Sequence, residues 1–145
     1  MSLDKSTMWG EIRLNTEDRN YKFLEVAAGQ YDFRVLNKEK EIRCSMHETE
    51  QEYGKDIWVG LPYSTWDFFN ELKDDSKCFV VLVDKHDSNV IYLPINKISK
   101  RYKFGYGTGL SFTLERIGEM YRIKGDPSSC LNEYTNKMEK LFEPL

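Results

Sequence analysis

The sequence predicts an α+β fold with a central mixed, largely antiparallel β-sheet flanked by two or three helices. Three observations carry this prediction. A continuous apolar run over 79–83, mostly β-branched, is typical of a central strand covered on both faces. Helix-start signals stand around Pro62 and at Asp126. Short runs of strand-forming residues, separated by polar turns, surround these features, and this mixture is typical of the α+β class.

Length and composition predict a single globular domain over 1–145, either complete or accessory to a larger protein. Hydrophobic residues make up 40% and aromatic residues 14% of the chain, which is enough for a ring-rich core without metals or disulfides. The net charge of −3, with both signs mixed, argues against a protein whose whole surface binds nucleic acid or anionic membrane. A local basic patch remains compatible with it.

The cysteines Cys44, Cys78 and Cys130 are odd in number, far apart and set in apolar stretches, without any CxxC pair. We expect buried free thiols, as in the reducing cytoplasm. No apolar run approaches membrane-spanning length, and no signal-peptide pattern opens the chain. We therefore expect a cytoplasmic domain that does not associate with membranes.

The segment 16–28 fits two structures. Thr16, followed by two acidic residues, is typical of a helix start, and Gly29 of a helix stop. Tyr21 and Phe23 instead favour a strand. We prefer the strand and leave the helix open.

The next elements are a hairpin, a short strand and a helix. Strands over 31–36 and 41–46 flank the turn segment NKEK, and a third strand over 56–61 leads into the helix. The helix is expected from Ser64, its cap, to about Lys73. Its apolar face has helical spacing and consists of Trp66, Phe68, Phe69 and Leu72.

Two hairpins and a helix complete the chain. The strand over 79–83 turns at 84–89 and returns over 90–93, where Pro94 marks a strand end or a sheet edge. Alternating apolar residues over 109–115 predict a half-buried strand that pairs with 120–124. A C-terminal helix is expected from Asp126, with an apolar stripe made by Cys130, Leu131, Tyr134, Met138, Leu141 and Phe142.

The first candidate site combines Asp32, Glu41 and Arg43 on the predicted hairpin. Residues two apart on a strand share a face, so Glu41 and Arg43 point the same way. Two carboxylates on adjacent strands can hold a divalent metal, and a nearby cation can neutralise a phosphate. The alternative is a hairpin whose Asp, Glu and Arg side chains simply face solvent, which is the more common meaning of this pattern, and we keep both interpretations.

The order of these segments resembles a known fold. A strand with Asp32 is followed by a strand opening with Glu41, a helix from Ser64 and the apolar strand 79–84. This order resembles the core of the restriction-endonuclease-like (PD-(D/E)xK) superfamily over about 31–98. The resemblance implies a nuclease, or the relic of one, in DNA defence or repair.

In this resemblance Asp32 matches the metal-binding aspartate of the family, Glu41 its second acid and Arg43 its lysine. It implies Mg²⁺ or Mn²⁺ at Asp32 and Glu41, catalysis by these three residues, and DNA or RNA as the partner. The sequence departs from the family pattern in three ways. Arginine replaces the lysine, no proline precedes Asp32, and no N-terminal helix with a supporting glutamate is evident, since Glu25 matches it poorly.

The second candidate site is the basic and aromatic segment KISKRYKFGYGTG over 97–109. Cations bind phosphates and rings stack on bases, whereas glycines let backbone amides approach an anion. The residues expected to bind nucleic acid are Lys97, Lys100, Arg101, Lys103 and Tyr106. A solvated loop with glycine turns is the alternative.

Two smaller polar clusters have weaker signals. The run 47–52 combines His47 with three glutamates but lacks the spacing of a known metal motif, so we expect a solvated loop, close to the first site. The turn 84–87 contains His86, and a hairpin tip explains it without a function.

The sequence thus predicts a nucleic-acid-associated, nuclease-like domain. The alternative is a non-catalytic protein-interaction or oligomerisation domain of a larger protein. Such a domain would contact its partner, or a second copy of itself, through Trp9, Trp58 or the C-terminal helix.

Overall fold

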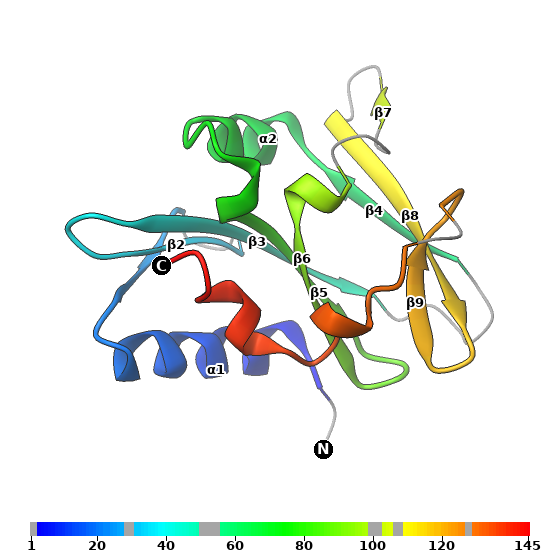
Figure 1. The fold of residues 1–145 in the computed structure, drawn as a ribbon, viewed down its shortest axis with the longest axis horizontal. Coiled ribbons are helices and arrows are strands. Elements are labelled where there is room, and N and C mark those ends of the chain that lie inside the picture. Colours follow the sequence, from blue (N-terminus) through cyan, green and yellow to red (C-terminus); the bar gives the residue numbers. More distant parts are fainter. Residues whose placement is uncertain (1–2, 28–30, 50–55, 99–102, 106–108, 127–128) are drawn as a thin grey trace.

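The computed structural model describes residues 3–27, 31–49, 56–98, 103–105, 109–126 and 129–145, which form two sheets and two α-helices (Figure 1). The first sheet has the order β1 (Lys22–Glu25), β2 (Asp32–Leu36), β3 (Glu41–Thr49), β5 (Cys78–Asp84) and β6 (Asn89–Pro94). In the second sheet β8 (Gly109–Ile117) pairs with β4 (Ile57–Leu61), β7 (Lys103–Gly105) and β9 (Met120–Ile123). The α-helices are α1 (Lys5–Asp18) and α2 (Tyr63–Asn70).

The first sheet is mixed and largely antiparallel, which confirms the predicted fold class. Only the β3–β5 pair is parallel, and its crossover contains β4 and α2. All seven residues of β5 are buried. As predicted, β6 ends at Pro94 on the sheet edge, and the hairpins β2–β3 and β8–β9 form.

The continuous apolar run of β5 is explained by the two cores that it joins. Val80 and Leu82 belong to the core shared with the second sheet and α2, whereas Val81 and Val83 belong to the core under α1. Figure 1 shows α1 and α2 on opposite sides of the first sheet. Each face of the central strand therefore meets its own apolar layer, and neither face of it reaches solvent.

The N-terminal helix was not predicted. It begins after Asp4, whose carboxylate accepts a hydrogen bond from the backbone N–H of Thr7 at 2.7 Å, and it buries only Met8, Ile12 and Thr16. Within the segment 16–28 the preferred strand is confirmed as β1, which follows a left-handed turn at Asn20, whereas Thr16 lies in the last turn of α1 and does not start a helix.

The predicted C-terminal helix is wrong. Within 129–145 the chain forms only two short 3₁₀ turns, Asn132–Tyr134 and Met138–Leu141. Between them Asn136 has a positive φ of 57°. Its backbone N–H donates to the Val90 carbonyl at 2.6 Å and its side-chain oxygen accepts from the Val90 N–H at 2.8 Å. The edge of β6 thus captures the backbone that a helix would have used.

Two smaller predictions also need correction. The helix α2 begins at Tyr63, with Pro62 as N-cap and no side-chain cap, so Ser64 does not cap it. Cys130 is exposed, whereas Cys44 and Cys78 are buried as predicted. Within the described residues, neither α-helix has the length and hydropathy that crossing a bilayer requires.

Candidate functional site

A small pocket of about 280 Å³ lies where β2 begins and α2 approaches the first sheet. Asp32 stands opposite Ser45 across the β2–β3 ladder, and Ser45 Oγ donates to Asp32 Oδ1 at 2.5 Å. Thr65, in the first turn of α2, donates from Oγ1 to Asp32 Oδ2 at 3.2 Å. Both carboxylate oxygens of Asp32 therefore accept a hydrogen bond from a hydroxyl group. Lys5 of α1 also lines the pocket.

His47 extends this cluster along β3. Its Nε2 lies 3.0 Å from Ser45 Oγ. Because the single hydroxyl proton of Ser45 points to Asp32, the contact needs a proton on His47 Nε2. Burial lowers the pKa of His47 to about 4, although the charge of Asp32 acts in the opposite direction. His47 is thus a neutral donor at pH 7, and it lies beside Asp32 as the sequence predicted, on a strand rather than in a loop.

We expect acid to destabilise the protein through His47. The folded pKa of about 4 lies below the ordinary value of 6.5, so the unfolded chain binds the extra proton. Stability from this residue is complete above pH 6.5 and falls as the pH drops towards 4, by up to roughly 1.4 kcal/mol per pH unit. Urea unfolding of wild type and His47→Gln between pH 4 and 8 measures this. Parallel pH profiles for the two proteins would contradict the prediction.

Glu41 lies at the other end of the hairpin. The register pairs it with Leu36, whereas Asp32 pairs with Ser45. Four residues of strand separate the two acids, roughly 13 Å at the usual rise. The structure therefore does not bring Asp32 and Glu41 together.

Two guanidinium groups hold Glu41 instead. Arg34 donates to both of its oxygens at 2.8 and 2.9 Å, and Arg43 donates from Nε at 2.6 Å. These contacts, that of Arg34 most of all, lower the pKa of Glu41 to about 2. Arg43 also donates to the Phe68 carbonyl and to Glu71. Glu41 and Arg43 share a face, as predicted, but they bind each other and α2.

The donor set at Asp32 does not fit the metal centre implied by the resemblance. A shared ion needs two carboxylates within about 5 Å of each other, since each oxygen stands about 2 Å from the metal. Within the described residues no group of three or more His, Cys, Asp or Glu side chains converges on one point. Ser45 occupies the position across from Asp32, and His47 lies two residues further along β3, so no second acid stands in either place.

The basic segment is partly visible. Lys97 is exposed in a 3₁₀ turn, Ile95–Lys97, and Lys103 opens β7 opposite Ser111 of β8. The other three predicted contact residues, Lys100, Arg101 and Tyr106, lie outside the described residues. The segment is thus anchored to the edge of the second sheet by a strand that the sequence did not predict.

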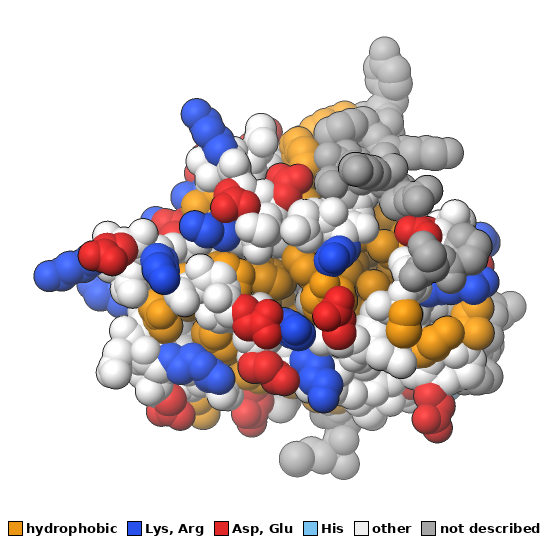
Figure 2. Space-filling model, in the orientation of Figure 1, with side chains coloured by type: hydrophobic (Ala, Val, Ile, Leu, Met, Phe, Trp, Pro, Cys, Tyr) orange, Lys and Arg blue, Asp and Glu red, His pale blue; other side chains and the backbone are white. Residues whose placement is uncertain are grey.

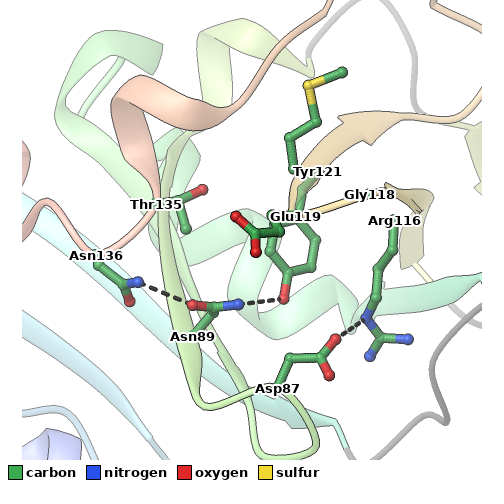
Figure 3. Close-up of a pocket in the computed structure, with 9 residues that line it drawn as sticks. Asp87, Asn89, Arg116, Gly118, Glu119, Tyr121, Thr135 and Asn136 are labelled. Carbon is green, nitrogen blue, oxygen red and sulfur yellow. Dashed lines mark hydrogen bonds and ion pairs between the residues drawn. The ribbon is translucent and has the colours of Figure 1, made fainter.

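A larger pocket, about 420 Å³, opens where the β5–β6 turn meets the β8–β9 hairpin (Figure 3). Behind it Asp84 is fully buried and accepts from the Tyr121 hydroxyl at 2.5 Å and from Arg116 at 3.1 Å. Arg116 also reaches Asp87 at 3.1 Å, as Figure 3 shows. Burial, followed by the hydrogen bond to Asp84, raises the pKa of Tyr121 to about 12.

The sequence did not predict this cluster, because residues 84–87 are also typical of a plain hairpin tip. Two signals were present. Arg116 continues the inward-facing positions after Phe112 and Leu114, and Asp84 directly follows the most apolar run of the chain. Because Asp84 of β5 and Arg116 of β8 form an ion pair, the cluster joins the two sheets.

Comparisons with known proteins give no further information on function. No family model matches the chain, and no curated protein shows significant similarity to it.

Proposed function

We propose that this chain is a nucleic-acid-binding domain of nuclease-like architecture, and that it does not cleave its ligand with a metal shared by Asp32 and Glu41. The observation that carries the binding half is the basic segment 97–103. Its four cations fall within seven residues, and the segment runs from an exposed turn into an edge strand of the second sheet. Cations that lie this close together in the sequence are suited to bind a phosphate backbone.

The absence of cleavage is supported by the two ends of the β2–β3 hairpin. Asp32 is surrounded by hydroxyl donors, and Glu41 is neutralised by Arg34 and Arg43. A carboxylate committed to two guanidinium groups would have to break both pairs before it could bind a metal.

The net charge also favours a local strip over a broad basic face. Figure 2 shows Lys and Arg side chains interspersed with Asp and Glu on the face that it presents. With a net charge of −3, binding to phosphate has to come from a cluster of cations rather than from the whole surface.

We expect salt-sensitive binding that depends on this strip. Binding of labelled single-stranded DNA, RNA and duplex DNA is measured by fluorescence anisotropy over a range of salt concentrations. Replacing Lys97, Lys100, Arg101 and Lys103 together by alanine should weaken binding at low salt. It should also reduce the slope of log K against log salt by up to about 3, since each phosphate contact contributes about 0.7 on a single strand.

The matched control removes four exposed lysines from elsewhere, Lys22, Lys38, Lys40 and Lys73. It makes the same change in net charge, so an equal loss in both variants would contradict a local strip. Absence of binding at low salt would overturn the proposal in favour of the interaction domain, which sedimentation velocity would then test as an oligomer. Cleavage in Mg²⁺ or Mn²⁺ that is lost in Asp32→Ala would overturn the second half.

A further inference from the structure

A thiol and a thioether lie side by side where β9 begins. The Sγ atom of Cys130 stands 3.9 Å from the Sδ atom of Met120, the first residue of β9. Thiolate and thioether sulfurs are the side-chain ligands that select soft metal ions such as Cu(I). The proposed nucleic-acid binding uses neither of these sulfurs.

The backbone on both sides of Cys130 is hydrogen-bonded to β9. On one side the Leu131 N–H donates to the Tyr121 carbonyl at 3.0 Å. On the other side the Ser129 hydroxyl accepts from the Ile123 N–H at 2.9 Å. These two contacts hold the segment along the strand that carries the thioether, so the short distance between the two sulfurs is set by the fold.

The backbone of Met120 is fixed as well. Met120 pairs with Ile117 of β8 at the turn of the β8–β9 hairpin, where Gly118 has a positive φ of 61°. A tight hairpin turn of this kind sets the register of the strands on either side of it. Both sulfurs therefore hang from a positioned backbone, and only side-chain torsions have to be ordered when an ion binds.

The separation of the two sulfurs fits one shared ion. An ion about 2.3 Å from each sulfur, the usual distance to a thiolate, makes an angle of roughly 115° with sulfurs that are 3.9 Å apart. This angle is close to that of a trigonal site in which two of three positions are filled. Because Cys130 is exposed, a small ligand from solution can reach the third position.

The same pair does not suit zinc or magnesium. Structural zinc takes four ligands, mostly from cysteine and histidine, and magnesium takes an octahedron of oxygen atoms. Within the part of the chain that the structure describes, no three His, Cys, Asp or Glu side chains gather around one point. A soft monovalent ion, which is satisfied by few sulfur ligands, fits the side chains that are present.

The other two thiols do not compete for such an ion. Cys44 and Cys78 are buried, and burial raises the pKa of both thiols, that of Cys78 to about 12. Because the thiolate is the form that binds a metal, these two side chains are poor ligands at neutral pH. Cys130 is thus the cysteine from which a metal site can be built.

We infer that Met120 and Cys130 bind one Cu(I) ion through their two sulfurs. On binding, the Cys130 thiol releases its proton to solvent and a Cu–Sγ bond forms. The thioether of Met120 donates a lone pair to the same ion, and the oxidation states of copper and sulfur do not change. The inference is independent of the proposed nucleic-acid binding, since the site shares no residue with the segment 97–103.

The test is a competition for Cu(I) between the protein and bicinchoninate, whose Cu(I) complex is coloured, without oxygen and with ascorbate present. Wild type should remove one ion per chain from the complex. Because loss of a mere supporting group costs roughly 10- to 100-fold in metal affinity, Met120→Leu should cost at least about 10-fold and Cys130→Ser at least about 100-fold. Met138→Leu removes a partly buried thioether from the other core, and this control should bind as wild type does.

A second readout locates the ion at the thioether. In NMR spectra of protein with isotope-labelled methionine methyl groups, Cu(I) should shift the Met120 resonance of wild type and leave the Met138 resonance in place. In Cys130→Ser the Met120 shift should be lost at the same ion concentration. Circular dichroism checks that each variant is folded.

Three results would overturn the site. If Met120→Leu binds Cu(I) as tightly as wild type, the thiol acts alone and the two sulfurs do not share an ion. If Cys130→Ser keeps the affinity of wild type, the ion is bound elsewhere. If wild type takes no ion from bicinchoninate, there is no such site. None of these results bears on nucleic-acid binding, which the salt titration tests separately.

Discussion

Replacement of Arg116 by methionine is expected to lower the free energy of unfolding by about 3–5 kcal/mol. Arg116 and Asp84 are almost completely buried, with side-chain exposures of 2% and 0%. Methionine keeps most of the volume but leaves the Asp84 carboxylate in the interior without a countercharge. The Tyr121 hydroxyl and the backbone N–H of His86 remain as donors, and hydrogen bonds alone compensate a buried charge poorly. Urea denaturation at pH 7 measures the change.

A matched control is the partly exposed pair Glu115–Arg122 on the same hairpin. Arg122→Met removes the partner of Glu115, whose side chain is 24% exposed, and should cost at most about 1 kcal/mol. The double variant Asp84→Leu with Arg116→Met should recover much of the lost stability, since an apolar pair avoids the buried charge. A loss below about 1 kcal/mol in Arg116→Met would show that Asp84 is not dependent on this arginine.

Replacement of Phe33 by alanine is expected to cost about 3–5 kcal/mol. The ring is fully buried, stacked on Phe23 at 4.7 Å and in edge contact with Trp9 at 5.3 Å between ring centres. It therefore packs against β1 within the first sheet and against α1 on its face. Thermal and urea unfolding measure the global loss. Amide hydrogen exchange should show that protection falls more in α1 and β1 than in β5.

Leu24 provides the control for this second prediction. It lies on β1 next to Phe23, on the opposite face, and is 40% exposed. Leu24→Ala should change the stability by no more than about 0.5 kcal/mol. Exchange in α1 that is unaffected by Phe33→Ala would mean that the helix is held by other contacts.

The elements predicted correctly are those whose pattern is local and strong. The apolar run of β5 requires cover on both faces wherever it is placed, and the alternation in β8 requires one buried face. The helix α1 escaped notice because it buries only Met8, Ile12 and Thr16, too narrow a stripe to stand out from its polar surroundings. Four residues of the predicted C-terminal stripe, Leu131, Tyr134, Leu141 and Phe142, are buried, but the edge of β6 competes for the backbone of this segment, and no local pattern reveals that.

At the candidate site, the sequence predicted one residue correctly but not its partners. The sequence identified Asp32 and the strand beside it, yet it paired Asp32 with Glu41. The tight turn after Leu36 fixes the register and places Ser45 opposite Asp32. The partnership of Glu41 with Arg34 follows from the same register, since both stand at the closed end of the hairpin. Thr65 and Lys5 reach the pocket from distant parts of the chain, and only the packing of the helices brings them there.

The position of β4 has a consequence for how the chain can be divided. This strand belongs to the second sheet but lies, along the chain, between two neighbouring strands of the first. A fragment ending at Pro94 would contain every strand of the first sheet. In that fragment β4 would lose its pairing with β8, and Val59 would no longer be covered by Phe112. The two sheets are interleaved in the sequence, so no single cut separates them. They should therefore be engineered as one unit.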